Sequence, residues 1–165
     1  SHCPSALLSS LKEELDDLPQ LREELDRGRD VAFLTLGDPS IYATPMYLHH
    51  ILRQQGYETR MIPGVPSFCA AAAALDISLC EGGEPLQIIP ASYPDGEEAL
   101  NAPGNKVLMK SGKSMGKIKE QIDTSRWDAM AVECCGMEQE KIHRSLDTLD
   151  ETSSYFSVVV VKGRA

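Results

Sequence analysis

One stretch limits the folds open to this chain more than any other: an apolar run from Val31 to Leu36 that stops at Gly37-Asp38-Pro39. A nearly continuous apolar run of this length predicts a strand covered on both faces, as in a parallel sheet. The glycine and proline that follow predict a tight loop at its carboxyl end. In open α/β sheets ligands bind outside the carboxyl ends of the strands, so this loop is the first candidate site.

Composition excludes several classes of partner. The 165 residues carry a formal net charge of -9, which argues against nucleic-acid binding because Lys and Arg supply the affinity for phosphates. No segment approaches the ~20 apolar residues of a membrane-spanning helix, and the first residues lack the pattern of a signal peptide. We therefore expect a soluble, cytoplasmic protein with neither a membrane nor a nucleic-acid partner.

The cysteines and histidines predict no metal site. The chain has five cysteines, an odd number, and no Cys-x-x-Cys pair, which favours reduced thiols with structural roles. Cys134 and Cys135 are adjacent and would face opposite sides of a strand. His49 and His50 are adjacent on a predicted helix, where their side chains diverge. No P-loop or Gly-x-Ser-x-Gly motif occurs, and no catalytic residue can be assigned.

The first residues predict an amphipathic helix with an acidic outer face. Its leucines recur at helical spacing: Leu7, Leu11, Leu15 and Leu18. Pro19 interrupts the pattern, and because proline fits a first turn but not a helix interior, the helix kinks or restarts there. Gly28 is the predicted stop.

A further helix is predicted beyond the candidate loop. Thr44 is a good capping residue, Pro45 suits the first helical turn and Gly56 ends the helix. Residues 57–62 are expected to be extended, and residues 63–66 to form a turn. Strand, helix and strand in this order predict a βαβ unit with a right-handed crossover.

Turn-forming residues at 81–85 predict a boundary between an amino-terminal domain, residues 1–84, and a carboxyl-terminal domain, residues 85–165. Four strands and two helices are predicted in the second domain, together with a polar loop at 92–105. The strands are 86–90, 106–110, 129–134 and 155–162, and the helices are 115–122 and 139–149. The alternation of strands and helices in both halves predicts an α/β fold of two domains.

The candidate loop has residue types suited to a ligand. Gly37 allows close approach of the backbone, Asp38 offers a carboxylate to hydroxyl or amino groups, and Pro39 holds the turn. The alternative is an ordinary turn in which Asp38 only caps a short helix. Ser67, before an alanine-rich helix, is better suited to capping or a hydroxyl contact than to nucleophilic catalysis.

The order of the motifs resembles one enzyme family. Leu36-Gly37-Asp38-Pro39-Ser40-Ile41-Tyr42, followed by Pro63-Gly64-Val65-Pro66-Ser67-Phe68, resembles the S-adenosylmethionine-dependent tetrapyrrole methylases. Val107-Leu108-Met109-Lys110 and the closing segment Tyr155-Phe156-Ser157 to Lys162 are most similar to the members that methylate carbon 20 of precorrin-2. The Gly-Asp-Pro motif is shared across that family and says little about the substrate.

The resemblance implies two α/β domains with S-adenosylmethionine in the cleft between them, S-adenosylhomocysteine as the product and a homodimer. The substrate would be precorrin-2 or cobalt-factor II, with Tyr42 at the mouth of the loop orienting it. The residues implied to bind the cofactor are Gly37, Asp38, Pro39, Ile41, Ser67, Met109, Lys110, Cys135, Gly136 and Met137. For Met109, ordinary packing in a buried strand is an equal alternative.

One departure from the family bears on activity. Family members begin with a strand that ends in a glycine-rich loop, and nothing before Val31 supplies it. We therefore expect a first domain incomplete at its amino terminus and poor catalysis by this polypeptide alone. Two alternatives stay open: a methylase of the same fold acting on another tetrapyrrole, RNA or a diphthamide precursor, and a non-catalytic α/β binding or dimerisation module.

Overall fold

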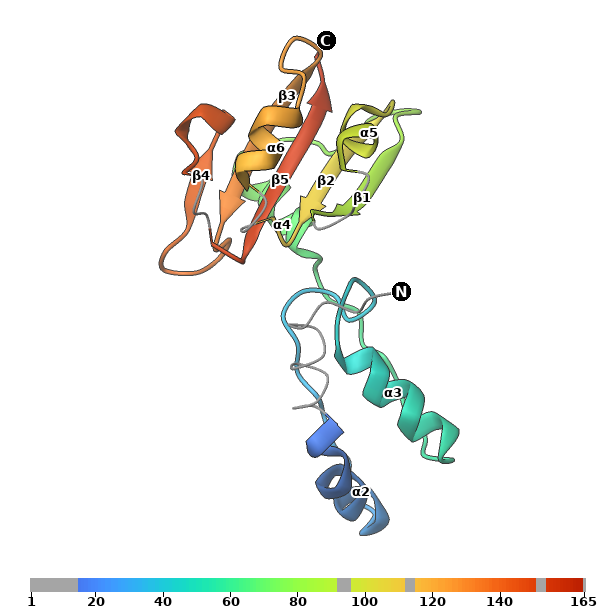
Figure 1. The fold of residues 1–165 in the computed structure, drawn as a ribbon. Coiled ribbons are helices and arrows are strands. Elements are labelled where there is room, and N and C mark those ends of the chain that lie inside the picture. Colours follow the sequence, from blue (N-terminus) through green and yellow to red (C-terminus); the bar gives the residue numbers. More distant parts are fainter. Residues whose placement is uncertain (1–14, 92–95, 112–114, 151–153, 165) are drawn as a thin grey trace. The chain divides into compact units, whose positions relative to one another are not determined.

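The structure, a computed structural model, describes residues 15–91, 96–111, 115–150 and 154–164. The chain divides into two compact units, Ser1–Pro66 and Ser67–Ala165, which are described separately here (Figure 1). This division lies earlier in the chain than the predicted domain boundary at 84/85, because the helix that begins at Ser67 packs on the sheet of the second unit. The domain boundary itself stays a prediction.

Two helices dominate the described part of the first unit, α2 (Leu18–Asp26) and α3 (Pro45–Gln54). Each has a proline in its first turn, as predicted, since that position needs no backbone donor. The predicted cap is wrong in one respect, because the Thr44 side chain makes no capping hydrogen bond. Leu18, Leu48 and Leu52 form a small apolar core between the helices. Leu7 and Leu11 lie outside the described residues.

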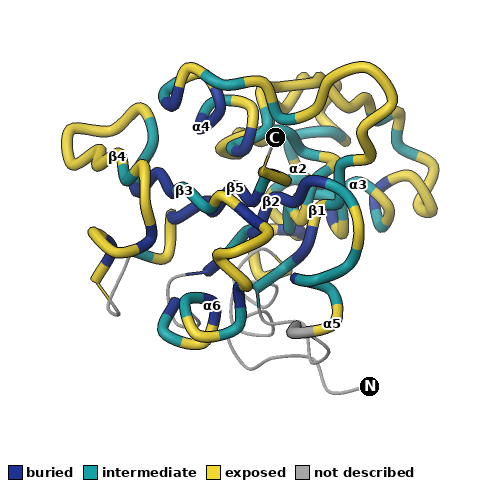
Figure 2. Tube along the Cα trace, turned by 90° about the horizontal axis from the view of Figure 1, so that it is seen from above, coloured by how far each residue is buried: buried dark blue, intermediate teal, exposed yellow. Residues whose placement is uncertain are grey.

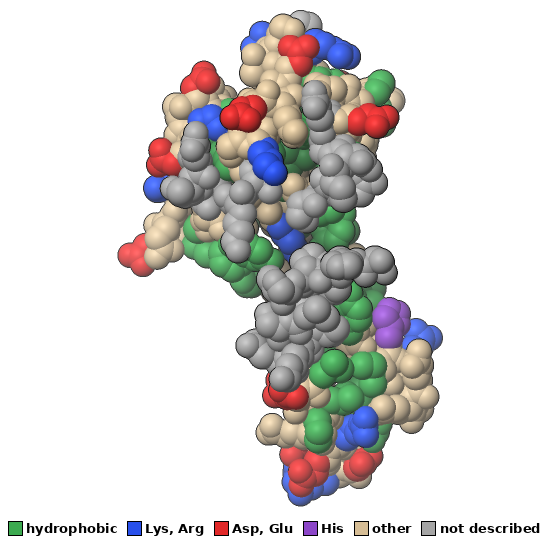
Figure 3. Space-filling view, in the orientation of Figure 1, with side chains coloured by type: hydrophobic (Ala, Val, Ile, Leu, Met, Phe, Trp, Pro, Cys, Tyr) green, Lys and Arg blue, Asp and Glu red, His purple; other side chains and the backbone are tan. Residues whose placement is uncertain are grey.

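The strand predicted at 31–36 is wrong. These residues form no strand, and their side chains are exposed, Leu34 by 88% and Leu36 by 76%. Residues 57–62 form no strand either, so the predicted βαβ unit is not present in the described part of this unit. The physical reason is pairing: a strand is stable only beside another strand, and the described residues of this unit offer none. Figure 3 shows apolar side chains at the surface of this unit.

The second unit contains a five-stranded mixed sheet with the order β1-β2-β5-β3-β4 (Figure 1). β1 and β2 are parallel, whereas β5 runs antiparallel to both β2 and β3, and β4 runs antiparallel to β3. The strands are β1 (Leu86–Pro90), β2 (Asn105–Met109), β3 (Trp127–Glu133), β4 (Lys141–His143) and β5 (Ser157–Gly163). The α/β fold predicted from the alternation of elements is confirmed.

Helices cover both faces of this sheet, as Figure 2 shows. α4 (Ser67–Leu75) packs on one face against β3 and β5. The opposite face is covered by α5 (Gly96–Asn101), α6 (Met115–Gln121) and a 3-10 turn at Leu146–Thr148. Central strand residues are fully buried because both faces are covered; Val159 and Val160, which point to opposite faces, are each 0% exposed.

Most predicted elements of the second unit are confirmed within one or two residues, and β1 matches its predicted ends. The helix predicted at 139–149 is wrong, because this segment instead forms β4 and the 3-10 turn. Pairing of His143 and Ile142 with β3 replaces the helical hydrogen bonds. The predicted polar loop at 92–105 contains α5. Among the described residues, no helix is long and apolar enough to cross a membrane.

Candidate functional site

The Gly37 loop of the first unit is held by its own aspartate. Gly37 has a φ of +84°, a left-handed conformation that glycine adopts without strain. One carboxylate oxygen of Asp38 accepts the backbone N–H of Ser40 at 2.8 Å and also the Ser40 hydroxyl. The other accepts the backbone N–H of Gly64 at 2.9 Å. The carboxylate therefore joins two loops that lie 26 residues apart in the sequence.

These hydrogen bonds act on the charge of Asp38. The Ser40 hydroxyl, the Gly64 N–H and the Ser40 N–H hold the pKa of this carboxyl below its usual value of 3.8. Each donor stabilises the ionised form, which carries the negative charge that the donors face. Asp38 is therefore ionised at neutral pH and well supplied with donors from the chain itself.

Gly64 is a residue that sequence reasoning did not select. A Cβ atom on Gly64 would lie 2.3 Å from the Gly37 carbonyl oxygen, closer than side-chain carbons are ever found. Only glycine allows this approach, since the obstacle is backbone rather than a flexible side chain. The sequence signal was present in Pro63-Gly64-Val65-Pro66, but its partner 26 residues earlier could not be read from spacing.

Tyr42, the predicted substrate residue, follows the loop directly. Its φ is +49° and its side chain is 48% exposed. Left-handed backbone is uncommon at a bulky residue, and strained backbone of this kind clusters at functional sites. Pro39 and Ile41 are half-buried, and the Ile41 N–H donates to the Asp38 carbonyl at 3.2 Å, which closes the turn.

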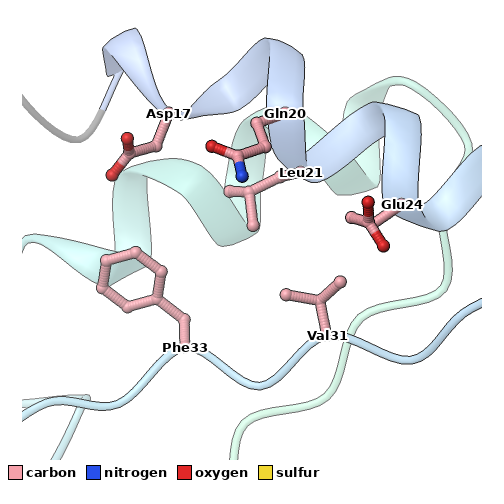
Figure 4. Close-up of a pocket in the computed structure, with 6 residues that line it drawn as sticks. All are labelled: Asp17, Gln20, Leu21, Glu24, Val31 and Phe33. Carbon is pink, nitrogen blue, oxygen red and sulfur yellow. The ribbon is translucent and has the colours of Figure 1, made fainter.

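A separate open hollow of about 290 Å³ lies between α2 and residues 31–33 (Figure 4). In Figure 4, Val31 and Phe33 point toward the helix. The lining residues are Asp17, Gln20, Leu21, Glu24, Val31 and Phe33. None of the predicted site residues lines it, so the hollow is not assigned to the site.

In the second unit, the predicted residues gather at one edge of the sheet. β2 and β3 run in the same direction, because each is antiparallel to β5, and so their carboxyl ends share an edge. Met109 pairs with Val158, and Glu133 pairs with Ser157. Met109 and Lys110 therefore leave the sheet beside the start of β5, and the segment 135–137 leaves it on the other side of that strand.

Hydrogen bonds fix both segments to the start of β5. The buried Ser111 hydroxyl donates to the Ser157 carbonyl at 3.1 Å. The Cys134 N–H donates to the Phe156 carbonyl at 2.9 Å. Lys110 and Cys134 both have left-handed backbone, with φ of +59° and +49°. Two such non-glycine residues at one sheet edge mark strained turns, which cluster at ligand sites.

The turn from Cys134 to Glu140 presents Cys135, Gly136 and Met137. The Gly136 N–H donates to a Glu140 carboxylate oxygen at 2.6 Å, and the Met137 N–H donates to the Cys134 carbonyl at 2.9 Å. Burial, together with the nearby Glu140 carboxylate, raises the pKa of the Cys135 thiol above its ordinary value of 9.0. This thiol is protonated at neutral pH and is not a nucleophile.

Ser67 belongs to the same unit as this edge. It begins α4, and the chain after α4 is bonded to the opposite edge of the sheet. Asn105, at the start of β2, donates from its side chain to the Leu79 carbonyl at 2.9 Å, and Lys162, near the end of β5, donates to the Ser78 carbonyl at 2.7 Å. The amino end of α4 is thereby directed toward the edge that carries Met109.

Two aromatic side chains at this edge were predicted to lie inside the last strand. Tyr155 and Phe156 instead precede β5 and are 60% and 52% exposed. Their ring centroids lie 5.4 Å apart with planes at 84°, an edge-to-face pair. The exposed pair stands beside Ser157, so an apolar surface adjoins the predicted cofactor residues of the second unit. Among the described residues, no cluster of His, Cys, Asp or Glu could hold a metal ion.

The family model for Tetrapyrrole (Corrin/Porphyrin) Methylases matches residues 6–150 of this chain. The chain belongs to the tetrapyrrole methylase family. The match spans both compact units and includes the Gly37 loop, Met109 and the turn at Cys135. The resemblance expected from the motif order is thus confirmed.

Curated relatives of this tetrapyrrole methylase include proteins named for cobalamin biosynthesis and for the methylation of precorrins. The cobalamin biosynthesis protein CobIJ of Mycobacterium tuberculosis is 33% identical over 153 residues, which cover 90% of this chain and 30% of that protein. A probable cobalt-precorrin-2 C(20)-methyltransferase of Methanocaldococcus jannaschii is 31% identical, covering 86% and 63%. A precorrin-4 C(11)-methyltransferase of Rhodococcus erythropolis is 30% identical, covering 81% and 54%. This chain therefore spans less than two thirds of each of these relatives.

Solved structures show the same fold. The cobalt precorrin-4 methyltransferase CbiF superposes with a TM-score of 0.76 at 18% identity, covering 87% of this chain and 68% of that one. A uroporphyrin-III C-methyltransferase of Thermus thermophilus, complexed with S-adenosylhomocysteine, gives 0.57 at 17% identity, covering 76% and 62%. At these identities the likeness establishes the fold alone.

Proposed function

We propose that this tetrapyrrole methylase acts as an S-adenosylmethionine-dependent C-methyltransferase of cobalamin biosynthesis. The observation that carries the proposal is the family match over residues 6–150. The names of the curated relatives support the pathway, and the complexed Thermus thermophilus structure supports the methyl donor. Because this chain spans only part of those relatives, the activity is proposed for the protein that contains it.

The residues present fit such a cofactor. A nucleoside needs backbone hydrogen-bonding groups and an apolar slot. The Gly37 loop, with Pro39 and Ile41, offers accessible backbone in the first unit, and Ser67 offers a hydroxyl at the start of α4. In the second unit, one edge of the sheet offers two apolar side chains, the half-buried Met109 and the exposed Met137. The backbone of the turns beside them, at Lys110, Cys135 and Gly136, offers hydrogen-bonding groups.

When bound, S-adenosylmethionine would supply an electrophilic methyl group on its sulfonium for transfer to a carbon of the macrocycle, with S-adenosylhomocysteine as the leaving group. Such a transfer needs alignment more than a protein nucleophile, and positioning alone contributes roughly 7–11 kcal/mol in well-oriented model reactions. The chain's residues agree with this requirement, since the Cys135 thiol is held protonated and Asp38 is occupied by backbone donors. We assign the chain's residues to holding the cofactor and excluding water.

The proposed substrate is precorrin-2 or cobalt-factor II, methylated at carbon 20, with Tyr42 orienting the macrocycle. Two of the three relatives described above differ in the carbon that their names specify, C(20) and C(11), so the C(11) reaction is the second candidate. Incubating the protein with labelled S-adenosylmethionine and each precursor, followed by mass spectrometry of the product, separates them. We also propose a homodimer in the cytoplasm.

Cofactor binding is tested by titrating the 165-residue chain with S-adenosylhomocysteine in a calorimeter. We expect Met109→Ala to weaken binding by roughly tenfold, because a contact of about 1.4 kcal/mol is lost at the sheet edge. Met130→Ala is the matched control, since Met130 lies inside β3 away from that edge and its loss should leave the affinity unchanged. Equal weakening by both variants, or no heat from the unaltered chain up to high micromolar ligand, would contradict the proposal.

A further inference from the structure

The Asp38 carboxylate has both oxygens engaged by its own chain. One oxygen accepts the Ser40 N–H at 2.8 Å together with the Ser40 hydroxyl, and the other accepts the Gly64 N–H at 2.9 Å. A carboxylate that already receives three donors has little capacity left for a ligand hydroxyl. The side chain that looks best suited to hold a ligand is therefore committed to the fold of the loop.

Comparison with a second aspartate shows which of these hydrogen bonds goes beyond an ordinary local turn. Asp123 makes the same local turn, accepting the Ser125 N–H at 3.0 Å and the Ser125 hydroxyl at 2.6 Å from one carboxylate oxygen. Both motifs have the pattern Asp-x-Ser, and the local turn is common for this pattern. Asp38 differs by its bond to Gly64, which reaches 26 residues along the chain.

Backbone contact accompanies that bond. The position where a Gly64 Cβ would stand lies 2.3 Å from the Gly37 carbonyl oxygen and 3.6 Å from the Asp38 Cα. The two loops therefore touch through main chain on one side and through the carboxylate on the other. Only Val65 and Pro66 separate this contact from Ser67, where the second compact unit begins.

We propose that Asp38 is a positioning residue, whose carboxylate clips residues 37–40 to residues 63–66 and does not itself contact the cofactor. The proposal rests on the proposed function, because it assigns ligand contact to the backbone of the clipped loop. Gly64 is then as necessary for cofactor binding as Asp38, although its side chain offers nothing to a ligand.

A double-mutant cycle tests the clip in the 165-residue chain, with calorimetric affinity for S-adenosylhomocysteine as one readout. Asp38→Asn removes the charge and one acceptor, and Gly64→Ala drives the loops apart without altering Asp38. We expect each single substitution to weaken binding by roughly tenfold or more. The double variant should bind no worse than the single variant with the lower affinity, because both substitutions break the same contact between the two loops. Asp123→Asn, the matched control, should leave the affinity unchanged.

A second readout does not depend on binding. An amide proton that donates to a carboxylate resonates downfield, so the Gly64 amide signal should move upfield in Asp38→Asn. It should stay in place in Asp123→Asn and in Ser40→Ala, which keeps the Gly64 bond. If the unaltered chain binds no S-adenosylhomocysteine, the proposed function fails while this signal still tests the clip.

Three outcomes would overturn the proposal. If the double variant lost affinity by the product of the two single-variant factors, Asp38 and Gly64 would act independently. Normal affinity in Gly64→Ala beside weak affinity in Asp38→Asn would show that the carboxylate contacts the ligand directly. An unmoved Gly64 amide signal in Asp38→Asn would show that the clip does not form in solution.

Discussion

At the scale of single residues, Lys106 has an environment that is unusual for a lysine. It is 0% exposed in β2, although lysines are almost never fully buried. Its ammonium donates to the Gly104 carbonyl at 2.6 Å and lies 3.7 Å from the centroid of the Trp127 ring. A cation over an aromatic face is attracted by the negative charge density of the ring. The hydrogen bond and the ring partly replace the water that burial removes.

Burial, with a smaller contribution from Arg126, lowers the pKa of Lys106 from 10.5 to about 8. The folded chain therefore binds fewer protons than the unfolded chain between about pH 8 and pH 10.5, and the free energy of unfolding gains a positive slope with pH there. Lys106→Met should remove this slope, and Lys117→Met, at an exposed position on α6, should keep it. Urea denaturation followed by Trp127 fluorescence at several pH values measures the slope. An identical slope in Lys106→Met would refute the assignment.

At the scale of elements, two predictions failed for one reason. Residues 31–36 have a strand's composition but no paired strand among the described residues, and residues 139–149 have a helix's spacing but form β4 and a 3-10 turn. A sequence pattern reports only the side chains of one segment. A strand, in contrast, is stable only when a neighbouring strand completes its backbone hydrogen bonds. β3 supplies that neighbour to β4.

A pair of leucine truncations tests this difference. Leu108→Ala, in β2 at 1% exposure, should lower the free energy of unfolding of the second unit by about 2–5 kcal/mol, since it leaves a cavity in a close-packed core. Leu34→Ala, at 88% exposure, should change stability by less than about 0.5 kcal/mol. Urea denaturation followed by circular dichroism and by Trp127 fluorescence measures both. A loss at Leu34 as large as that at Leu108 would show that residues 31–36 are buried after all.

At the scale of the whole molecule, the two compact units differ in how much core they hold. The first unit has a cluster of three buried leucines between α2 and α3, whereas the second has a twelve-residue cluster on one sheet face alone. Hydrophobic burial is the main favourable contribution to folding, so the larger core predicts higher local stability. The residues that the family resemblance implies for cofactor binding are found in both units, and their contact with a cofactor stays a prediction.

Hydrogen exchange followed by mass spectrometry should reflect this difference. We expect peptides from β2, β3 and β5 to exchange slowest, because their amides are paired in a covered sheet. Peptides covering 31–36 and 57–62 should exchange within the earliest time points, since they form no strand ladder. Protection of 31–36 equal to that of β5 would contradict the description of the first unit.

Motif order was enough to predict the family, and local patterns were enough to predict the α/β class and most elements of the second unit. Composition, turn residues and apolar runs such as Val158 to Val161 are local properties, and they suffice where both sheet faces are covered. The sequence also placed Gly37, Met109 and Gly136 as site candidates through motif order, and their contact with a cofactor stays a prediction.

The fold was needed to show that Met109 and the turn at Gly136 share one edge of the second unit's sheet, and that Asp38 holds two loops of the first unit together. The strand register brings Met109 beside the start of β5, and a contact spanning 26 residues makes Gly64 the partner of Asp38. Neither can be read from spacing, because pairing between distant segments depends on how the chain folds back on itself and not on the local order of residues. The Gly-Asp-Pro motif could be recognised from sequence as a candidate loop, and the fold shows that its carboxylate holds two loops together.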